Sequence, residues 1–301
     1  MIDAVVLREC GRPPALERRP APEPGDGRVL IDVVAAPITP LDLLCASGTS
    51  YFGTPATPYV PGVQGVGHLR DGTAVWFATA AGMQPGDGSM ASVVAVPSAD
   101  VVTLPPGAPP VLVAALGLSA VAAHGALHAG GGPSGRDVLV LGAGGVVGQA
   151  AIQLALLGGA SRVIAVARSE TALRRAESLG ATATTIEHLD GPADLVVDPV
   201  FGEPAAAALR VLRPGGTLVN LGSSAGATAP IDSATLRSRS LRVVGYTNNA
   251  LSPARRATMI SEIAAHATAG RLTVAHEAVP VTGIADAWAR QGSGRRVLTF
   301  G

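Results

Sequence analysis

A glycine-rich segment near the middle of the chain constrains the fold more than any other feature. Residues 142–148 read Gly-Ala-Gly-Gly-Val-Val-Gly. The apolar run 137–141 before them is typical of a buried parallel strand, and residues 149–157 after them carry apolar side chains at helical spacing. Strand, glycine turn and helix in this order predict a phosphate-binding unit, because the first N–H groups of a helix have no intrahelical partner and attract anions.

The spacing differs from the strict G-x-G-x-x-G pattern, because the last glycine comes one residue late. Glycines alone are also compatible with an ordinary tight turn. If the unit binds a dinucleotide, the pyrophosphate contacts should come from the turn and the start of the helix, that is from Gly142, Gly144, Gly145, Val146 and Val147.

A second strand, residues 162–167, follows about twenty residues after the turn and ends in Ala167-Arg168-Ser169. In a nicotinamide-binding fold the end of this strand faces the adenosine ribose, where an acidic residue selects NAD. Here Arg168 can pair with a 2′-phosphate, and Ser169 can add a hydroxyl donor. The segment therefore predicts NADPH over NADH. The alternative for Arg168 is a solvated surface charge.

Composition narrows the possible partners and location. Lys plus Arg and Asp plus Glu are both 22, so the net charge of zero gives no sign of a nucleic-acid partner. The only two cysteines, Cys10 and Cys45, fit a reducing cytoplasm rather than a disulfide framework. The chain opens without a basic signal-like segment, and the most apolar stretch, residues 111–123, predicts a buried helix rather than a membrane span.

The pattern of elements changes along the 301 residues. Residues 1–108 are β-rich, with strands at 29–36, 73–78 and 91–96, and prolines between 37 and 61 that predict loops. From 111 onward, helices and strands alternate, as in a parallel sheet. The predicted fold class is α/β, with a doubly wound Rossmann domain at 110–267 and a β-rich barrel domain at 1–109 and 268–301.

Several segments together resemble the medium-chain dehydrogenase/reductase superfamily. Residues 61–67 look like its P-G-x-E-x-x-G segment, and residues 88–97 look like its G-x-x-A-E-Y-x-x-V-P segment. Residues 116–120, 138–157 and 212–216 fit the family's pattern in the same order. The resemblance covers nearly the whole chain and implies that the β-rich domain is GroES-like.

Within that superfamily, the residues favour the zinc-free quinone oxidoreductase group. The zinc branch has G-H-E where this chain has Gly62-Val63-Gln64. The zinc branch also has a cysteine ligand two or three residues before an Asp, and this chain has no cysteine at those positions before Asp42. Two cysteines cannot form the family's four-cysteine structural zinc site. We therefore predict no metal and a zinc-independent enzyme.

The resemblance implies hydride transfer from NADPH to a quinone or an α,β-unsaturated carbonyl compound. Tyr51 lies in a segment like the family's substrate-cleft loop, where its phenol can donate to the developing oxyanion. Thr39 stands where the group often has Asn and keeps a hydroxyl donor. The alternative for Tyr51 is an aromatic residue of a surface loop that packs on neighbouring prolines. Asp42 is predicted to cap the loop that contains it.

Further expectations come from the same resemblance. Leu221 and Gly222, after the strand at 217–221, and Asn248, after the strand at 241–245, are expected to contact the cofactor. Relatives often form homodimers through the strand that corresponds to residues 241–245. A biosynthetic enoyl or enone reductase and a non-catalytic NADPH-binding sensor or scaffold stay open as alternatives.

Overall fold

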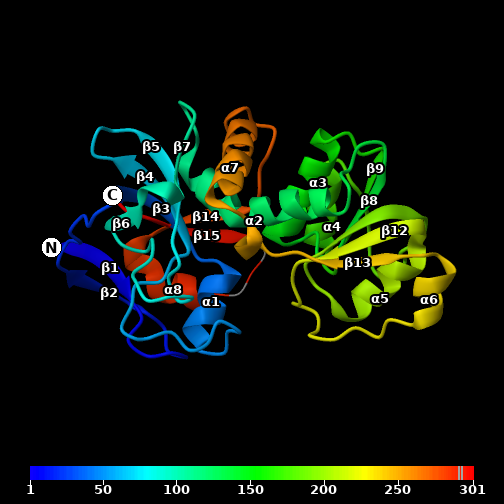
Figure 1. Cartoon of the computed structure of the whole chain (residues 1–301), viewed down its shortest axis with the longest axis horizontal. Helices are drawn as coiled ribbons and strands as arrows, with labels where there is room; N and C mark the ends of the chain where they lie inside the picture. Colours follow the sequence, from blue (N-terminus) through cyan, green and yellow to red (C-terminus); the bar gives the residue numbers. More distant parts are fainter. Residues whose placement is uncertain (291, 293) are drawn as a thin grey trace. The chain divides into compact units, whose positions relative to one another are not determined.

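The computed structural model describes residues 1–290, 292 and 294–301 (Figure 1). By packing, the chain forms two compact units. Unit 1 comprises Met1–Gly117, Ser252–Gly270 and Ala275–Gly301, and unit 2 comprises Leu118–Leu251 and Arg271–Val274. The division into domains at residues 109/110 and 267/268 remains a prediction. In the packing-based division, residues 110–117 and the helix α7 (Pro253–Thr268) group with unit 1.

Unit 2 contains a parallel six-stranded sheet with the order β10-β9-β8-β11-β12-β13. The strands are β8 (Asp137–Val140), β9 (Arg162–Val166), β10 (Thr182–Thr184), β11 (Ala193–Asp198), β12 (Leu212–Asn220) and β13 (Arg242–Gly245). This order is that of a doubly wound dinucleotide fold, whose switch point lies between β8 and β11. The predicted Rossmann sheet is confirmed (Figure 1).

Helices pack against both halves of this sheet. Helix α3 (Val146–Leu157) contacts β8 and β9, α4 (Glu170–Ser178) contacts β9 and β10, and α5 (Gly202–Val211) contacts β11 and β12. A short α6 (Ser233–Ser238) precedes β13. Leu139, Val196 and Leu209 belong to the buried core between the sheet and α5. Apolar side chains on both faces of the central strands explain why these strands read as continuous hydrophobic runs.

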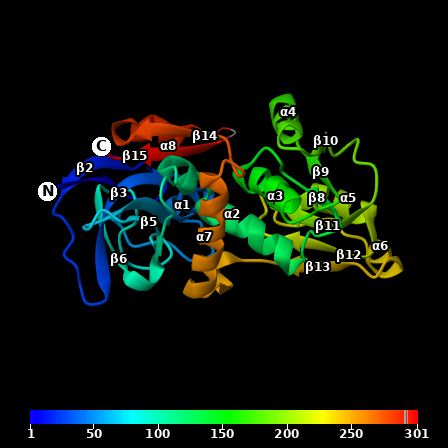
Figure 2. The ribbon, with the colours of Figure 1, turned by 90° about the horizontal axis from the view of Figure 1, so that it is seen from above.

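Unit 1 is β-rich, as predicted. Its main sheet has the order β14-β15-β3-β4-β5-β7, with β6 paired to β3, and a separate hairpin joins β1 to β2. The strands are β1 (Ile2–Val6), β2 (Ala15–Arg19), β3 (Arg28–Pro37), β4 (Gln64–Leu69), β5 (Ala74–Ala78), β6 (Val93–Pro97), β7 (Val101–Thr103), β14 (His276–Pro280) and β15 (Arg295–Thr299). Helix α8 (Ile284–Ala289) packs against β14 and β2 (Figure 2).

The expectation that prolines leave only loops between residues 37 and 61 is wrong at one place. Helix α1 (Pro40–Ser47) begins at Pro40, with Thr39 as its N-cap and Asp42 completing a capping box. Proline suits the first helical position because its missing N–H has no partner there anyway. One proline of this segment, Pro40, therefore starts a helix, while the others lie outside it.

The predicted buried helix at 111–123 is longer in the structure, where α2 spans Pro110–Ala129. It is long and apolar enough to cross a membrane by composition alone, yet 61% of its most apolar window is buried inside the protein. Gly117 interrupts it with φ 25° and ψ −127°. A Cβ at Gly117 would lie 2.0 Å from Oε1 of Gln64, so the interruption depends on glycine.

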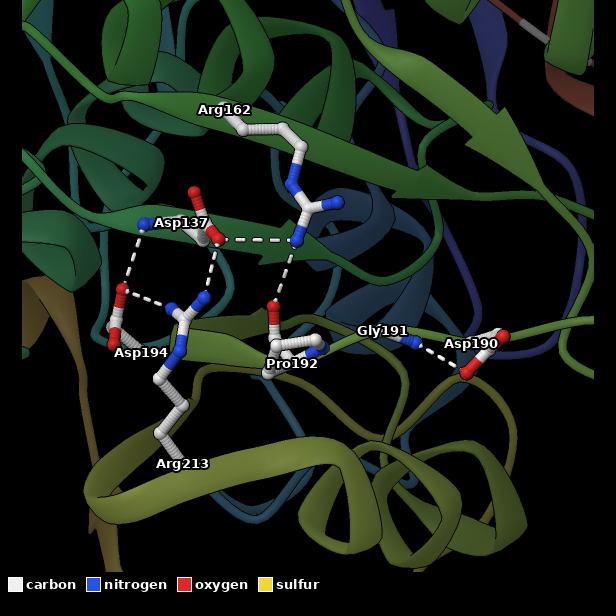
Figure 3. A network of polar contacts seen from close by, with 7 residues as sticks. All are labelled: Asp137, Arg162, Asp190, Gly191, Pro192, Asp194 and Arg213. Carbon is white, nitrogen blue, oxygen red and sulfur yellow. Dashed lines mark hydrogen bonds and ion pairs between the residues drawn. The ribbon is translucent and has the colours of Figure 1, made fainter.

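A network of charged residues joins the amino ends of four strands of unit 2 (Figure 3). Oδ2 of Asp137 accepts hydrogen bonds from Arg162 at 3.0 Å and from Arg213 at 2.8 Å. Arg213 also donates to Asp194 at 2.8 Å, and Asp194 accepts from the backbone N–H of Asp137. Burial alone would raise the pKa of Asp137, but the two guanidinium groups outweigh it and lower that pKa.

We predict that Asp137→Asn lowers the free energy of unfolding by about 1–2 kcal/mol at neutral pH, because two arginines lose a charged acceptor. The folded-state pKa lies below the unfolded value of about 3.9, so this stabilisation is present above that value and is lost as the pH falls through the folded pKa. Urea denaturation of wild type and variant at neutral and acidic pH should therefore show a difference that shrinks on acidification.

The control is Glu170→Gln, which removes an exposed ion pair to Arg174 at 2.9 Å on one helix. We expect that variant to lose less than about 0.5 kcal/mol. Equal losses in the two variants would contradict the role of the Asp137 network.

Candidate functional site

The glycine turn between β8 and α3 requires glycine for distinct reasons. Gly142 has φ +62°, which L side chains rarely adopt. A Cβ at Gly148 would lie 2.5 Å from the carbonyl oxygen of Gly142, and one at Gly144 would lie 2.9 Å from Cβ of Ala172. At Gly145 a Cβ would meet only an ordinary contact of 3.5 Å. The late final glycine thus still allows the helix to pack closely on the turn.

The start of α3 offers N–H groups to an anion. The N-cap of α3 is Gly145, which has no side chain to cap the helix. The first helical residues are Val146, Val147 and Gly148, and their N–H groups have no acceptor within the helix. The side chain of Gln149 donates to the carbonyl of Gly144 at 2.9 Å and fixes the turn from the helix side. A cradle of backbone N–H groups without intruding side chains fits the pyrophosphate of a dinucleotide.

Arg168 and Ser169 lie between β9 and α4, at the carboxyl end of β9. Ser169 is the N-cap of α4, and its hydroxyl oxygen accepts from the N–H of Ala172 at 3.3 Å. Arg168 is exposed, and Glu170, the acidic residue closest to it in sequence, pairs with Arg174 instead. The guanidinium of Arg168 is therefore accessible to a phosphate, and the serine hydroxyl hydrogen can still be donated.

The carboxylate of Asp198, fully buried at the end of β11, organises the loops around it. Its Oδ1 accepts from the backbone N–H of Val200 at 2.9 Å and of Phe201 at 2.8 Å, and its Oδ2 accepts from Asn220 at 3.1 Å. Burial raises the pKa of Asp198 against the lowering effect of these hydrogen bonds. Asn220 also donates to the carbonyl of Gly222 at 2.7 Å, so one carboxylate connects the loops after β11 and β12.

The predicted cofactor residues after β12 and β13 occupy defined positions. The N–H of Leu221 donates to the carbonyl of Asp198 at 2.9 Å, and a Cβ at Gly222 would lie 2.6 Å from the carbonyl oxygen of Pro199. Asn248 donates to the carbonyl of Leu118 at 2.9 Å, whereas its buried Oδ1 has no hydrogen-bond partner among the described residues. Such an acceptor fits an amide donor, which the carboxamide of a nicotinamide provides.

All the predicted cofactor residues thus lie in unit 2, after the carboxyl ends of its strands. They are Gly142, Gly144, Gly145, Val146 and Val147 after β8, Arg168 and Ser169 after β9, Leu221 and Gly222 after β12, and Asn248 after β13. Ligands of doubly wound sheets bind at this edge. The individual contacts stay predictions.

Thr39, one of the two predicted catalytic residues, has a clear local role in unit 1. Its hydroxyl donates to Oδ2 of Asp42 at 2.6 Å, and its backbone N–H donates to the same oxygen at 2.7 Å. Oδ1 of Asp42 accepts from Val63 at 2.9 Å. Both side chains are buried, and burial raises the pKa of Asp42 against these hydrogen bonds. A catalytic role for Thr39 stays a prediction, in addition to its observed role as helix cap.

Tyr51, the other predicted catalytic residue, is 78% exposed in the loop after α1. Its ring lies against that of Phe52, with the ring centroids 4.2 Å apart. The phenol is therefore accessible to a substrate carbonyl as a donor.

Position 64, which is Glu in the zinc branch, carries a fully buried glutamine. Its Oε1 accepts from the indole N–H of Trp76 at 3.2 Å. Among residues 1–290, 292 and 294–301, no group of three or more His, Cys, Asp or Glu side chains is arranged to hold a metal ion.

Phe201 was not identified from the sequence. Its backbone has φ 56° and ψ −155°, a region that residues other than glycine rarely adopt. Nothing about a phenylalanine in an apolar segment signals such a conformation.

Known proteins are similar to this chain over most of its length. Residues 146–265 match a family model described as zinc-binding dehydrogenase, although that segment contains no cysteine. The chain is 27% identical over 288 residues to a zinc-type alcohol dehydrogenase-like protein of Schizosaccharomyces pombe, which covers 89% of this chain and 84% of that protein.

Two further relatives have more specific names. The chain is 33% identical over 221 residues to the 2-methylene-furan-3-one reductase of Solanum lycopersicum, covering 66% of this chain and 56% of that protein. The quinone oxidoreductase of Thermus thermophilus, whose structure was also solved as a complex with NADPH, aligns with a TM-score of 0.81 and 29% identity over 99% of this chain and 100% of that chain.

Proposed function

The chain belongs to the medium-chain dehydrogenase/reductase superfamily, and from this premise we propose that it is a zinc-independent, NADPH-dependent reductase of quinones or α,β-unsaturated carbonyl compounds. The observation that carries the proposal is the exposed Arg168 after the second strand of the glycine-turn unit. A guanidinium there matches the charge and geometry of a 2′-phosphate, where an acidic residue would repel it.

The residues of unit 2 fit a dinucleotide. The N–H groups at the start of α3 would hold the pyrophosphate, and the glycines at 142 and 148 let the turn pack closely on its neighbours, since a Cβ at either position would strike other protein atoms. Asn248 would accept a hydrogen bond from the carboxamide through its unpartnered Oδ1. Bound NADPH supplies the hydride.

The proposed reaction needs no metal, because a carbon conjugated to a carbonyl is already electrophilic. As hydride adds to that carbon, negative charge develops on the carbonyl oxygen. Tyr51 would donate a hydrogen bond to this oxygen, and a proton from a donor or from solvent completes the reduction. Thr39 is the second catalytic residue that we propose, and its hydroxyl, which donates to Asp42 at 2.6 Å, would turn to the substrate to act as a donor.

Zinc independence is supported by residue types. Val63 and Gln64 occupy the positions where the zinc branch has His and Glu. The side-chain oxygen of Gln64 accepts a hydrogen bond from the indole N–H of Trp76. Cys10 and Cys45 are free thiols, which also supports a cytoplasmic location.

The name of the tomato relative favours a second candidate function, reduction of an enone of specialised metabolism. A non-catalytic NADPH-binding protein is the third, favoured by the replacement of the family's Asn by Thr39. Acceptor-dependent oxidation of NADPH over simple quinones and enones would support the first candidate. NADPH binding without such oxidation would leave the second and third candidates, which a screen of metabolites as acceptors then separates.

For Arg168→Ala, we expect the Kd of NADPH to rise about 10- to 100-fold and that of NADH to stay within about twofold, because only the 2′-phosphate loses its partner. Fluorescence titration of both cofactors measures this. Arg174→Ala is the matched control, since Arg174 lies on the adjacent helix and pairs with Glu170. Equal losses for the two cofactors would contradict the assignment of Arg168.

For Tyr51→Phe, we expect kcat to fall about tenfold or more while the Kd of NADPH stays unchanged, because the variant lacks only the hydroxyl donor. Steady-state oxidation of NADPH with the best acceptor gives the rate. Tyr59→Phe is the control, since Tyr59 is 5% exposed and its hydroxyl has no hydrogen-bond partner among the described residues. An unchanged kcat in Tyr51→Phe would rule out Tyr51 as the donor.

We also propose a homodimer in which β13 of one copy pairs with β13 of a second copy. β13 is the outer strand of the described sheet, and its Val243 is 43% exposed. An outer strand offers unpaired N–H and C=O groups, and an exposed apolar residue on it favours a covering partner. Sedimentation should give a dimer for the wild type and a monomer for Val243→Lys. A monomeric wild type at micromolar concentration would contradict the proposal.

A further inference from the structure

Phe201 is strained in a way that glycine would not be. With φ 56° and ψ −155°, it occupies a region reserved almost entirely for glycine, and Gly202 follows it at φ 67°. Strain of this kind persists only where the surroundings impose it, and it concentrates at functional sites. The ring of Phe201 is half-buried against the core between the sheet and α5, which gives the strained backbone an anchor.

The strained residue belongs to a tightly held turn, residues 198–202, which we call the Phe201 elbow. The N–H groups of Val200 and Phe201 both donate to the same oxygen of Asp198. The carbonyl of Val200 accepts from the N–H of Ala225 at 2.7 Å. The elbow is therefore fixed to β11 at one side and to the loop after β12 at the other.

The Phe201 elbow also touches the glycine turn. Cγ1 of Val200 lies 2.7 Å from the place that a Cβ on Gly142 would occupy, and the carbonyl oxygen of Pro199 lies 2.6 Å from the corresponding place at Gly222. β8 and β11 are neighbours in the sheet, and their carboxyl ends flank its switch point. The elbow thus packs between two backbone segments assigned to the dinucleotide.

We propose that Phe201 is a positioning residue for the dinucleotide. Its ring, packed against the core between the sheet and α5, anchors the elbow, holds Val200 against Gly142 and so keeps the glycine turn in the conformation that receives the pyrophosphate. This inference rests on the proposed function, since it assigns a role within the same site. A turn that spends less time in the competent conformation binds its ligand more weakly in proportion to the lost population.

The test compares Phe201→Gly, Phe201→Leu and Leu189→Ala. Phe201→Gly removes the ring that packs on the core and also lifts the restriction on the backbone. Phe201→Leu keeps an apolar side chain against that core. Leu189 packs against the same core without belonging to the elbow. We expect Phe201→Gly to raise the Kd of NADPH about tenfold and Phe201→Leu to keep it within about twofold. Leu189→Ala should lower the melting temperature and leave the Kd unchanged.

Hydrogen exchange of the ligand-free protein gives a second readout that needs no cofactor. Amides of residues 142–148 should exchange faster in Phe201→Gly than in the wild type, and at the wild-type rate in Leu189→Ala. Unchanged exchange and unchanged Kd in a folded Phe201→Gly would overturn the inference alone. A wild type that binds no NADPH would overturn the proposed function, and the assignment to the dinucleotide with it.

Discussion

The buried carboxylate of Asp198 is the interaction on which the candidate dinucleotide site depends. It receives hydrogen bonds from the turn after β11 and from Asn220 on β12, and Asn220 in turn holds the carbonyl of Gly222. Without it, backbone N–H groups buried at the end of the sheet would lack an acceptor, which costs more than the hydrogen bonds themselves contribute. Asp198 thus helps to position the backbone of Phe201 directly and the carbonyl of Gly222 through Asn220.

The two ends of the parallel sheet carry a half-buried carboxylate, Asp137, and a fully buried one, Asp198, whose pKa values are shifted in opposite directions. At the amino end, guanidinium groups lower the pKa of Asp137 below its unfolded value, so ionisation favours folding. At the carboxyl end, burial without a cationic partner in its hydrogen-bond set raises the pKa of Asp198, so its contribution to stability falls as the pH rises through the folded pKa. Ionisation of Asp137 therefore favours folding, whereas ionisation of Asp198, next to the candidate site, opposes it.

Local patterns in the sequence predicted the parallel sheet well, since continuous apolar runs and glycine turns report directly on buried strands and helix starts. They missed α1, although Thr39-Pro40 with Asp42 at the third helical position is a recognisable start signal. The conformation of Phe201 could not have been predicted, because the elbow is also held by the hydrogen bond from Ala225 to the carbonyl of Val200 and by the packing of the ring on the core, and both come from distant parts of the chain. No local pattern indicates, likewise, that Gln64 lies against Gly117.

The site is defined more by backbone than by side chains. Gly142, Gly148 and Gly222 occur where a Cβ would strike another backbone or a neighbouring side chain, whereas Phe201 retains a side chain in a conformation suited to glycine. In the first arrangement the missing Cβ atoms let neighbouring segments pack closely, and in the second a bulky side chain restricts the backbone. Because one backbone geometry is compatible with many side chains, this fold is shared at 29% identity with the Thermus thermophilus enzyme, whereas the proposed preference for NADPH depends on a single exposed side chain, Arg168.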